Sequence, residues 1–65
     1  MNKIELRFVP EALYGELINN YHLARGLYQS RYERIQYAVK YFCLAHPEIS
    51  YTGAYKDLSA SLDGW

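Results

Sequence analysis

Two histidines and one cysteine are the side chains of this 65-residue chain best suited to catalysis or metal binding. A predicted turn separates His22 from His46, and neither stands at a spacing that joins it to a carboxylate or thiol as a catalytic set. Cys43 and His46 are one helical turn apart and can share a metal ion, but protein metal sites normally use about three or four ligands. We therefore expect no enzymatic activity, no bound metal and no cofactor.

Eight tyrosines are the second feature with chemical potential. In the middle of the chain four of them interleave with basic residues, in the order Arg25, Tyr28, Arg31, Tyr32, Arg34, Tyr37, Lys40 and Tyr41. Tyrosines at the edge of a small core bury the ring and keep the hydroxyl in water. The same side chains also supply contact area in protein interfaces, and their rings stack on single-stranded bases. All three interpretations stay open.

The elements that position these residues begin with a predicted strand. Residues 3–9 alternate in polarity, which is typical of a half-buried strand. One face carries Ile4, Leu6 and Phe8, and the other carries Lys3, Glu5 and Arg7. No later segment resembles a strand, so its backbone groups need a partner from outside the chain. The sequence therefore predicts a homodimer in which two copies pair these strands.

Three helices are predicted after the strand, over residues 10–26, 31–45 and 52–62. Pro10 suits a first helical turn, and Ser30 with Glu33 matches a capping box that opens the second helix. The second helix has one apolar ridge at Ile35, Ala38, Val39 and Phe42, and another at Tyr37, Tyr41 and Leu44. We expect the third helix to cover the second ridge. The predicted fold is mainly α: one domain, residues 1–65, with a short N-terminal β-strand followed by three helices.

This order of elements resembles the ribbon-helix-helix family of DNA-binding proteins. The resemblance covers roughly residues 3–44 and is carried by Ile4–Leu13 with Leu17, and by Ser30–Lys40. It implies an intertwined homodimer whose paired strands enter the major groove of DNA, with the helix over 52–62 as an addition. The DNA-binding residues that it implies are Lys3, Glu5 and Arg7 on the ribbon, and Ser30, Arg31 and Arg34 at the start of the second helix.

Composition leaves two classes of function open. The net charge is zero, but residues 1–46 carry six basic against four acidic side chains, and residues 47–65 carry one against three. The sequence has no signal-peptide pattern and no long apolar segment, so we expect a cytoplasmic protein that does not enter a membrane. The first hypothesis is a homodimeric, DNA-binding transcriptional regulator. The second is a non-enzymatic protein-interaction module that uses Tyr37, Tyr41, Tyr55 and the C-terminal helix.

Overall fold

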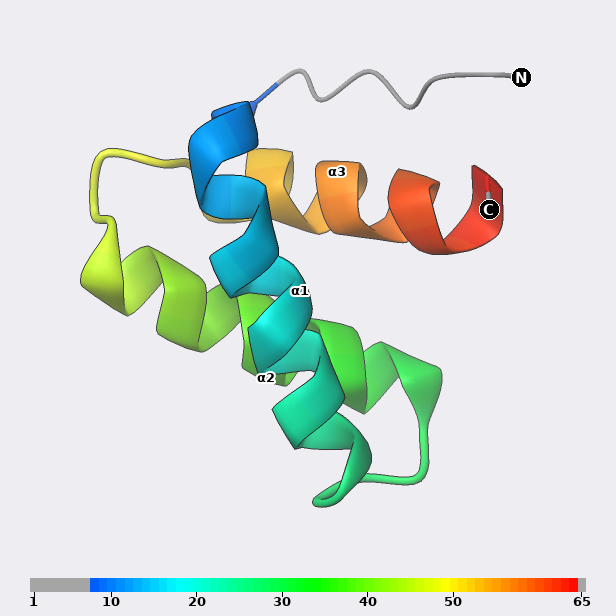
Figure 1. Ribbon diagram of the computed structural model, residues 1–65. Helices are drawn as coiled ribbons and strands as arrows, with labels where there is room; N and C mark the ends of the chain where they lie inside the picture. The colour runs from blue at the N-terminus through cyan, green and yellow to red at the C-terminus, as the bar shows by residue number, and fades with distance from the viewer. Residues whose placement is uncertain (1–7, 65) are drawn as a thin grey trace.

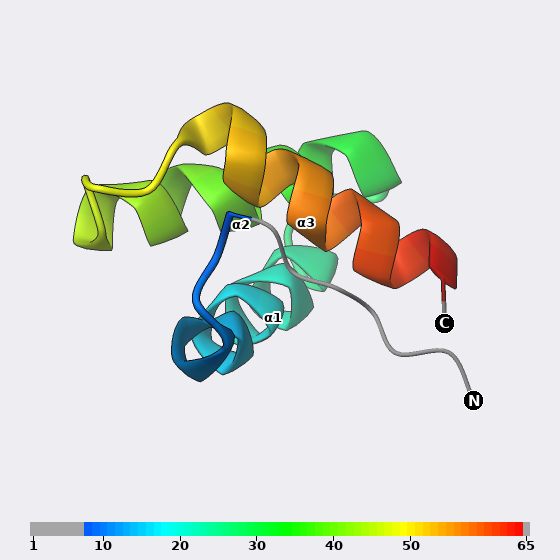
Figure 2. The same cartoon turned by 90° about the horizontal axis from the view of Figure 1, so that it is seen from above.

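The computed structural model describes residues 8–64, which form three α-helices. These are α1 (Glu11–Arg25), α2 (Arg31–Ala45) and α3 (Tyr51–Gly64). Helices α2 and α3 run in opposite directions, and α1 lies across them (Figure 1, Figure 2). Helix α2 packs against both of the others, so it is the central element of the fold.

Each helix begins at a local signal in the sequence. Pro10 precedes α1 with extended backbone angles, and its carbonyl accepts from the backbone N–H of Leu13. The Ser30 side chain caps α2 by accepting from the backbone N–H of Glu33 at 3.5 Å. Ser50 does the same for α3, where its hydroxyl accepts from the N–H of Gly53 at 3.2 Å. Serine oxygens suit this role because they satisfy one of the unpaired amides of a first helical turn.

The helix bounds differ from the predicted ranges by at most two residues. Helix α1 is one residue shorter at each end than 10–26, α2 coincides with 31–45, and α3 extends beyond 52–62 in both directions. The early start of α3 follows from the Ser50 cap, a signal that the sequence interpretation did not use.

The core lies where the three helices meet. Its fully buried side chains are Leu17 from α1, Val39 and Phe42 from α2, and Leu58 from α3. The other buried apolar residues of the cluster are Val9, Ile35, Ala38, Ile49 and Ala54. A polar contact joins α1 to α2 as well, because the Asn20 amide donates to the carbonyl of Ala38 at 3.3 Å. This contact gives a reason for a weak helix former in the middle of α1.

The predicted fold, mainly α with a short N-terminal β-strand before three helices, is wrong in having a strand. Residues 8–64 contain helices and no strand, and most of the predicted strand, residues 3–7, lies outside the described residues. Its last two residues, Phe8 and Val9, form a bend. Their backbone N–H groups both donate to one oxygen of Asp57, at 2.9 Å and 2.8 Å. In a strand, consecutive amides point to opposite sides, so a shared acceptor excludes regular pairing here.

Asp57 thus supplies, within one chain, an acceptor for the last two amides of the predicted strand. Its carboxylate is buried on α3, and its backbone carbonyl accepts from the Ser61 hydroxyl at 3.0 Å. The bend also allows Val9 to join the core. Homodimerisation, which the predicted strand motivated, stays a prediction.

A glycine lets the N-terminal segment approach α3 closely. A Cβ built on Gly53 would lie only 2.6 Å from both the Cβ and the Cγ of Phe8. Any other residue at position 53 would therefore push Phe8 away from the helix, because these atoms lie close to the backbone. Gly53 and Asp57 are one turn apart on α3, so together they hold residues 8 and 9 in place.

Candidate functional site

Exposed aromatic side chains from α2, the loop before it and the start of α3 gather around the outward face of α2. The inward face, which includes Ile35, Val39 and Phe42, is buried. The second apolar ridge points the other way, and the expectation that the third helix covers it is wrong. Tyr41 and Leu44 remain 48% and 67% exposed, because α3 packs beside the inward face of α2.

One row of rings follows the α1 side of this face. We call Tyr28, Tyr37 and Tyr41 the α1-side tyrosine row. The ring centroids of Tyr28 and Tyr37 are 5.8 Å apart, and those of Tyr37 and Tyr41 are 4.7 Å apart. Tyr28 comes from the loop before α2, and the Arg34 guanidinium donates through Nε to its backbone carbonyl at 2.7 Å. Arg34 therefore helps to hold the loop that carries the first ring of the row.

A second row follows the α3 side. This α3-side tyrosine row consists of Tyr32, Tyr55 and Tyr51, with Tyr55 at 6.3 Å from each neighbour, centroid to centroid. Burial raises the pKa of the Tyr51 phenol, and the nearby Tyr55, Tyr32 and Cys43 raise it further because each would repel its negative form. The Tyr51 hydroxyl therefore stays protonated at neutral pH and can donate a hydrogen bond.

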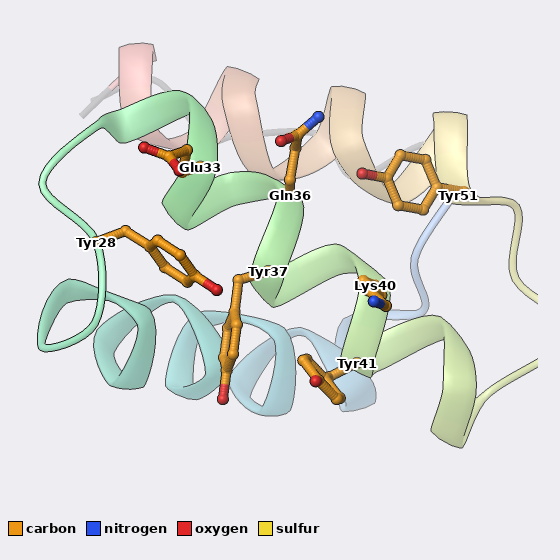
Figure 3. A pocket seen from close by; sticks show the side chains of 7 residues that line it. All are labelled: Tyr28, Glu33, Gln36, Tyr37, Lys40, Tyr41 and Tyr51. Atoms are coloured by element: carbon orange, nitrogen blue, oxygen red, sulfur yellow. The ribbon is translucent and has the colours of Figure 1, made fainter.

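Three polar side chains occupy α2 between the two rows. Glu33, Gln36 and Lys40 form this polar strip, since positions three, four and seven apart share a helix face. The Lys40 ammonium lies 5.8 Å from the ring centroid of Tyr41, within the range of a cation–π contact. Figure 3 shows Tyr37 projecting to one side of α2 and Gln36 to the other, with Tyr51 near the Lys40 end.

Together these side chains enclose a shallow surface pocket of about 350 Å³. Such a volume lies near the lower end of the range for sites that hold small molecules or short peptide segments. We call it the tyrosine pocket, and it is lined by Tyr28, Glu33, Gln36, Tyr37, Lys40, Tyr41 and Tyr51 (Figure 3). Its walls offer ring faces and hydroxyl donors, with one carboxylate and one ammonium.

Of the six residues predicted to bind DNA, the structure describes only Ser30, Arg31 and Arg34. Lys3, Glu5 and Arg7 lie outside the described residues. Ser30 caps α2, and Arg31 donates to the Asp63 carboxylate at 2.6 Å. With Arg34 bonded to the Tyr28 carbonyl, both described arginines of this set already have partners within the chain. DNA binding stays a prediction.

The residues predicted for a protein interface are partly brought together. Tyr37 and Tyr41 line the tyrosine pocket, whereas Tyr55 belongs to the α3-side row next to it. Sequence reasoning missed Tyr51 and Gln36 as members of the site. The spacing of Gln36 from Glu33 and Lys40 was a usable signal, but only the packing of α3 places Tyr51 beside α2.

The histidine and cysteine that resembled a weak metal pair have other surroundings. His46 Nε2 lies 2.8 Å from a carboxylate oxygen of Glu16, and its ring stacks near Phe42 at 4.8 Å between centroids. Burial raises the pKa of the Cys43 thiol, which favours the unreactive form. Within residues 8–64, no three histidine, cysteine or acidic side chains gather as a metal site.

Tyr14 carries a buried phenol hydroxyl outside the tyrosine pocket. Among the described residues, none forms a well-aligned hydrogen bond with the Tyr14 hydroxyl. Burial raises its pKa, the Ser61 hydroxyl partly lowers it, and the charge of Asp57 raises it again. Tyr14 also packs against the core, so its position has a structural reason.

Comparisons with known proteins add nothing to these observations. None of the helices in the described residues is long and apolar enough to cross a membrane. The resemblance to the ribbon-helix-helix family rests on the sequence pattern only. No protein-family model, curated protein or solved structure matches this chain.

Proposed function

We propose that this chain is a non-enzymatic interaction module that binds a segment of a partner protein in the tyrosine pocket. The observation that carries the proposal is the exposure of aromatic rings that already contact one another. Tyr28, Tyr32, Tyr41 and Tyr51 are between 37% and 59% exposed, although the ring of each lies against the ring of another tyrosine in a tilted or edge-on arrangement. Clustered, partly exposed tyrosines are typical of interface centres.

Stability of the fold does not account for this cluster. The buried core is assembled from Leu17, Phe42, Leu58 and smaller apolar residues, and the exposed tyrosines are not part of it. Ring contacts within each row do restrict the side chains before a partner arrives. A surface that is ordered in advance loses less conformational entropy on binding, so its contacts contribute more to affinity.

The chemistry of the pocket supports binding more than catalysis. Glu33 and Lys40 are the charged side chains that line it, and the remaining walls are tyrosines and Gln36. These groups provide apolar area, hydrogen bonds and two fixed charges. Such a combination gives affinity and orientation to a bound segment.

Selection from a displayed library of random 12-residue peptides tests this proposal directly. We expect the parent chain to select peptides that perturb the amide resonances of Tyr37, Lys40 and Tyr51 in heteronuclear NMR spectra. The double variant Tyr41→Ser, Tyr51→Ser removes one exposed ring from each side of the pocket. It should bind the selected peptides at least about tenfold more weakly, because buried tyrosines at interfaces typically contribute that much.

A matched control uses exposed apolar residues that do not line the pocket. Leu23 and Leu27 are as exposed as the tyrosines but do not line the pocket. The double variant Leu23→Ser, Leu27→Ser should keep the parent affinity. Failure to select any peptide, or selected peptides that lose affinity in the leucine variant and not in the tyrosine variant, would contradict the proposal.

A further inference from the structure

The polar strip presents two opposite charges at a fixed spacing. Glu33 and Lys40 are seven positions apart, or about 10.5 Å along the helix axis at 1.5 Å per residue. Within residues 8–64, neither side chain forms an ion pair, whereas Arg31 is paired with Asp63 and His46 with Glu16. Two charges that face the pocket without ion-pair partners can therefore pair with a ligand.

The backbone of the pocket excludes one common way of binding peptides. Strand addition needs an edge with free backbone N–H and carbonyl groups. The pocket is built mainly on α2, whose interior backbone groups are paired along the helix. A bound segment must therefore be recognised through side chains.

The centre of the pocket also disfavours a helical ligand. An amphipathic helix binds through an apolar stripe in a groove that is apolar along its length. Here the middle of the face carries Glu33, Gln36 and Lys40. Burying these groups under an apolar stripe would cost free energy, because they would lose water without gaining hydrogen bonds.

The hydrogen-bonding groups match a polyproline II segment instead. In this conformation the backbone carbonyls stay unpaired and proline carries no N–H, so the ligand needs donors from its binding site. The tyrosine hydroxyls, the Gln36 amide and the Lys40 ammonium all donate. Tilted ring pairs, at 55° for Tyr28 with Tyr37 and 52° for Tyr37 with Tyr41, expose ring faces on which proline rings can pack.

We propose that the tyrosine pocket binds a proline-rich segment in the polyproline II conformation, with a basic side chain at Glu33 and an acidic side chain at Lys40. This inference rests on the proposed function. Polyproline II rises about 3.1 Å per residue, so three residues span most of the axial separation between positions 33 and 40. The ligand pattern is therefore basic, two prolines, acidic, and it can run in either direction.

Four short peptides in a proline-rich context test the pattern. They contain Arg-Pro-Pro-Glu, Glu-Pro-Pro-Glu, Arg-Pro-Pro-Arg or Arg-Gly-Gly-Glu, and binding to the full chain is followed by NMR titration. We expect Arg-Pro-Pro-Glu to bind about threefold to fivefold more tightly than either like-charged peptide, as for partly exposed ion pairs. The glycine peptide should bind about tenfold more weakly, because it loses more conformational entropy.

A charge reversal in the protein makes the test specific to the polar strip. Glu33→Lys should change the preference from Arg-Pro-Pro-Glu to Glu-Pro-Pro-Glu. Glu11→Lys makes the same charge change in the first turn of α1, outside the pocket, and should leave the preference unchanged. Circular dichroism of both variants establishes that each is still helical.

Several results would overturn this inference. Equal affinity for the proline and glycine peptides would do so, as would a preference that Glu33→Lys leaves unaltered. Pocket resonances that shift with a single-stranded oligothymidine or with protein concentration, and not with peptide, would assign the surface to nucleic acid or to a second copy. If library peptides without proline bind at the pocket, the proposed function stands and only this inference fails.

Discussion

The two faces of α2 use similar residue types for different purposes. On the inward face, Ile35, Val39 and Phe42 meet side chains from α1 and α3 and lose nearly all contact with water. On the outward face, Tyr37 and Tyr41 meet mainly other tyrosines and remain in partial contact with water. Apolar spacing along a helix thus predicts a face, but only its neighbours decide whether that face is core or contact surface.

Truncating one large side chain on each face of α2 should show the largest difference in stability between the two faces. Phe42→Ala should destabilise the fold by about 3–5 kcal/mol, because a fully buried ring leaves a cavity. Tyr41→Ala should cost no more than about 1 kcal/mol, mainly the contact with the Tyr37 ring. Urea unfolding followed by circular dichroism measures both. Equal losses would mean that the outward tyrosines are a second core.

Asp57→Asn should give the next largest loss of stability. It tests how strongly Asp57 holds residues 8 and 9 against the core. Its carboxylate holds the amides of Phe8 and Val9, and Val9 belongs to the core. We expect a loss of about 1.5–3 kcal/mol, typical of buried hydrogen bonds to a charged group. Amide hydrogen exchange of residues 8 and 9 should accelerate as well.

Asp63→Asn is the matched control for that substitution. Asp63 is exposed and pairs with Arg31, so its loss should change stability by less than about 1 kcal/mol. If Asp57→Asn lowers the stability as little as Asp63→Asn does, residues 8 and 9 are held by their apolar contacts instead.

Two glycine substitutions in helices sharpen the comparison further. Gly53→Ala should destabilise the fold by about 1 kcal/mol, because strain against Phe8 outweighs the better helix propensity of alanine. Gly15→Ala meets no atom within 4 Å and should stabilise it by about 0.5–1 kcal/mol. Thermal unfolding of the two variants measures the opposite signs.

The variant Phe8→Gly identifies the cause of the Gly53 effect. Removing the Phe8 Cβ and ring should make a further Gly53→Ala change neutral or stabilising. A loss of stability that persists in this background would place the strain elsewhere on α3.

The helices were predictable from sequence because their signals are local. Ser30 and Pro47 bracket α2, and the predicted range 31–45 is the observed one. The segment before α1 was not predictable by the same means. Its alternation of polarity is a local pattern, but the acceptor of its last two amides, Asp57, lies 48 and 49 residues away in the chain. A distant side chain therefore overrode the local preference.

The candidate site was predictable to a similar extent. Tyr37 and Tyr41 are four positions apart on one predicted helix, so their proximity follows from helix geometry. Tyr28 reaches the row through a loop that Arg34 holds, and Tyr51 reaches the pocket through the packing of α3. Neither placement follows from spacing, because each depends on how separate elements meet.

Alkaline pH should have the smallest effect on the stability of the fold. It acts on a tyrosine on the core side and on a tyrosine on the outward side. Burial raises the pKa of Tyr14 on the core side and of Tyr51 on the outward side above the ordinary value of 10.0. Above that value the unfolded chain loses these protons while the folded chain keeps them, so unfolding is favoured progressively. The contribution of these two tyrosines to the free energy of unfolding should therefore be constant below about pH 9 and fall as the pH rises through the folded pKa values.

Phenylalanine substitutions separate the two contributions to this alkaline loss. Tyr14→Phe and Tyr51→Phe should each make the fall in unfolding free energy less steep, as measured by urea unfolding at several pH values. Tyr21→Phe is the control for the loss of a phenol hydroxyl, because Tyr21 also packs against the core. An unchanged slope in Tyr51→Phe would mean that the outward ring is hydrated like a free tyrosine. The α3-side row would then contribute contact area to a ligand without being ordered in advance.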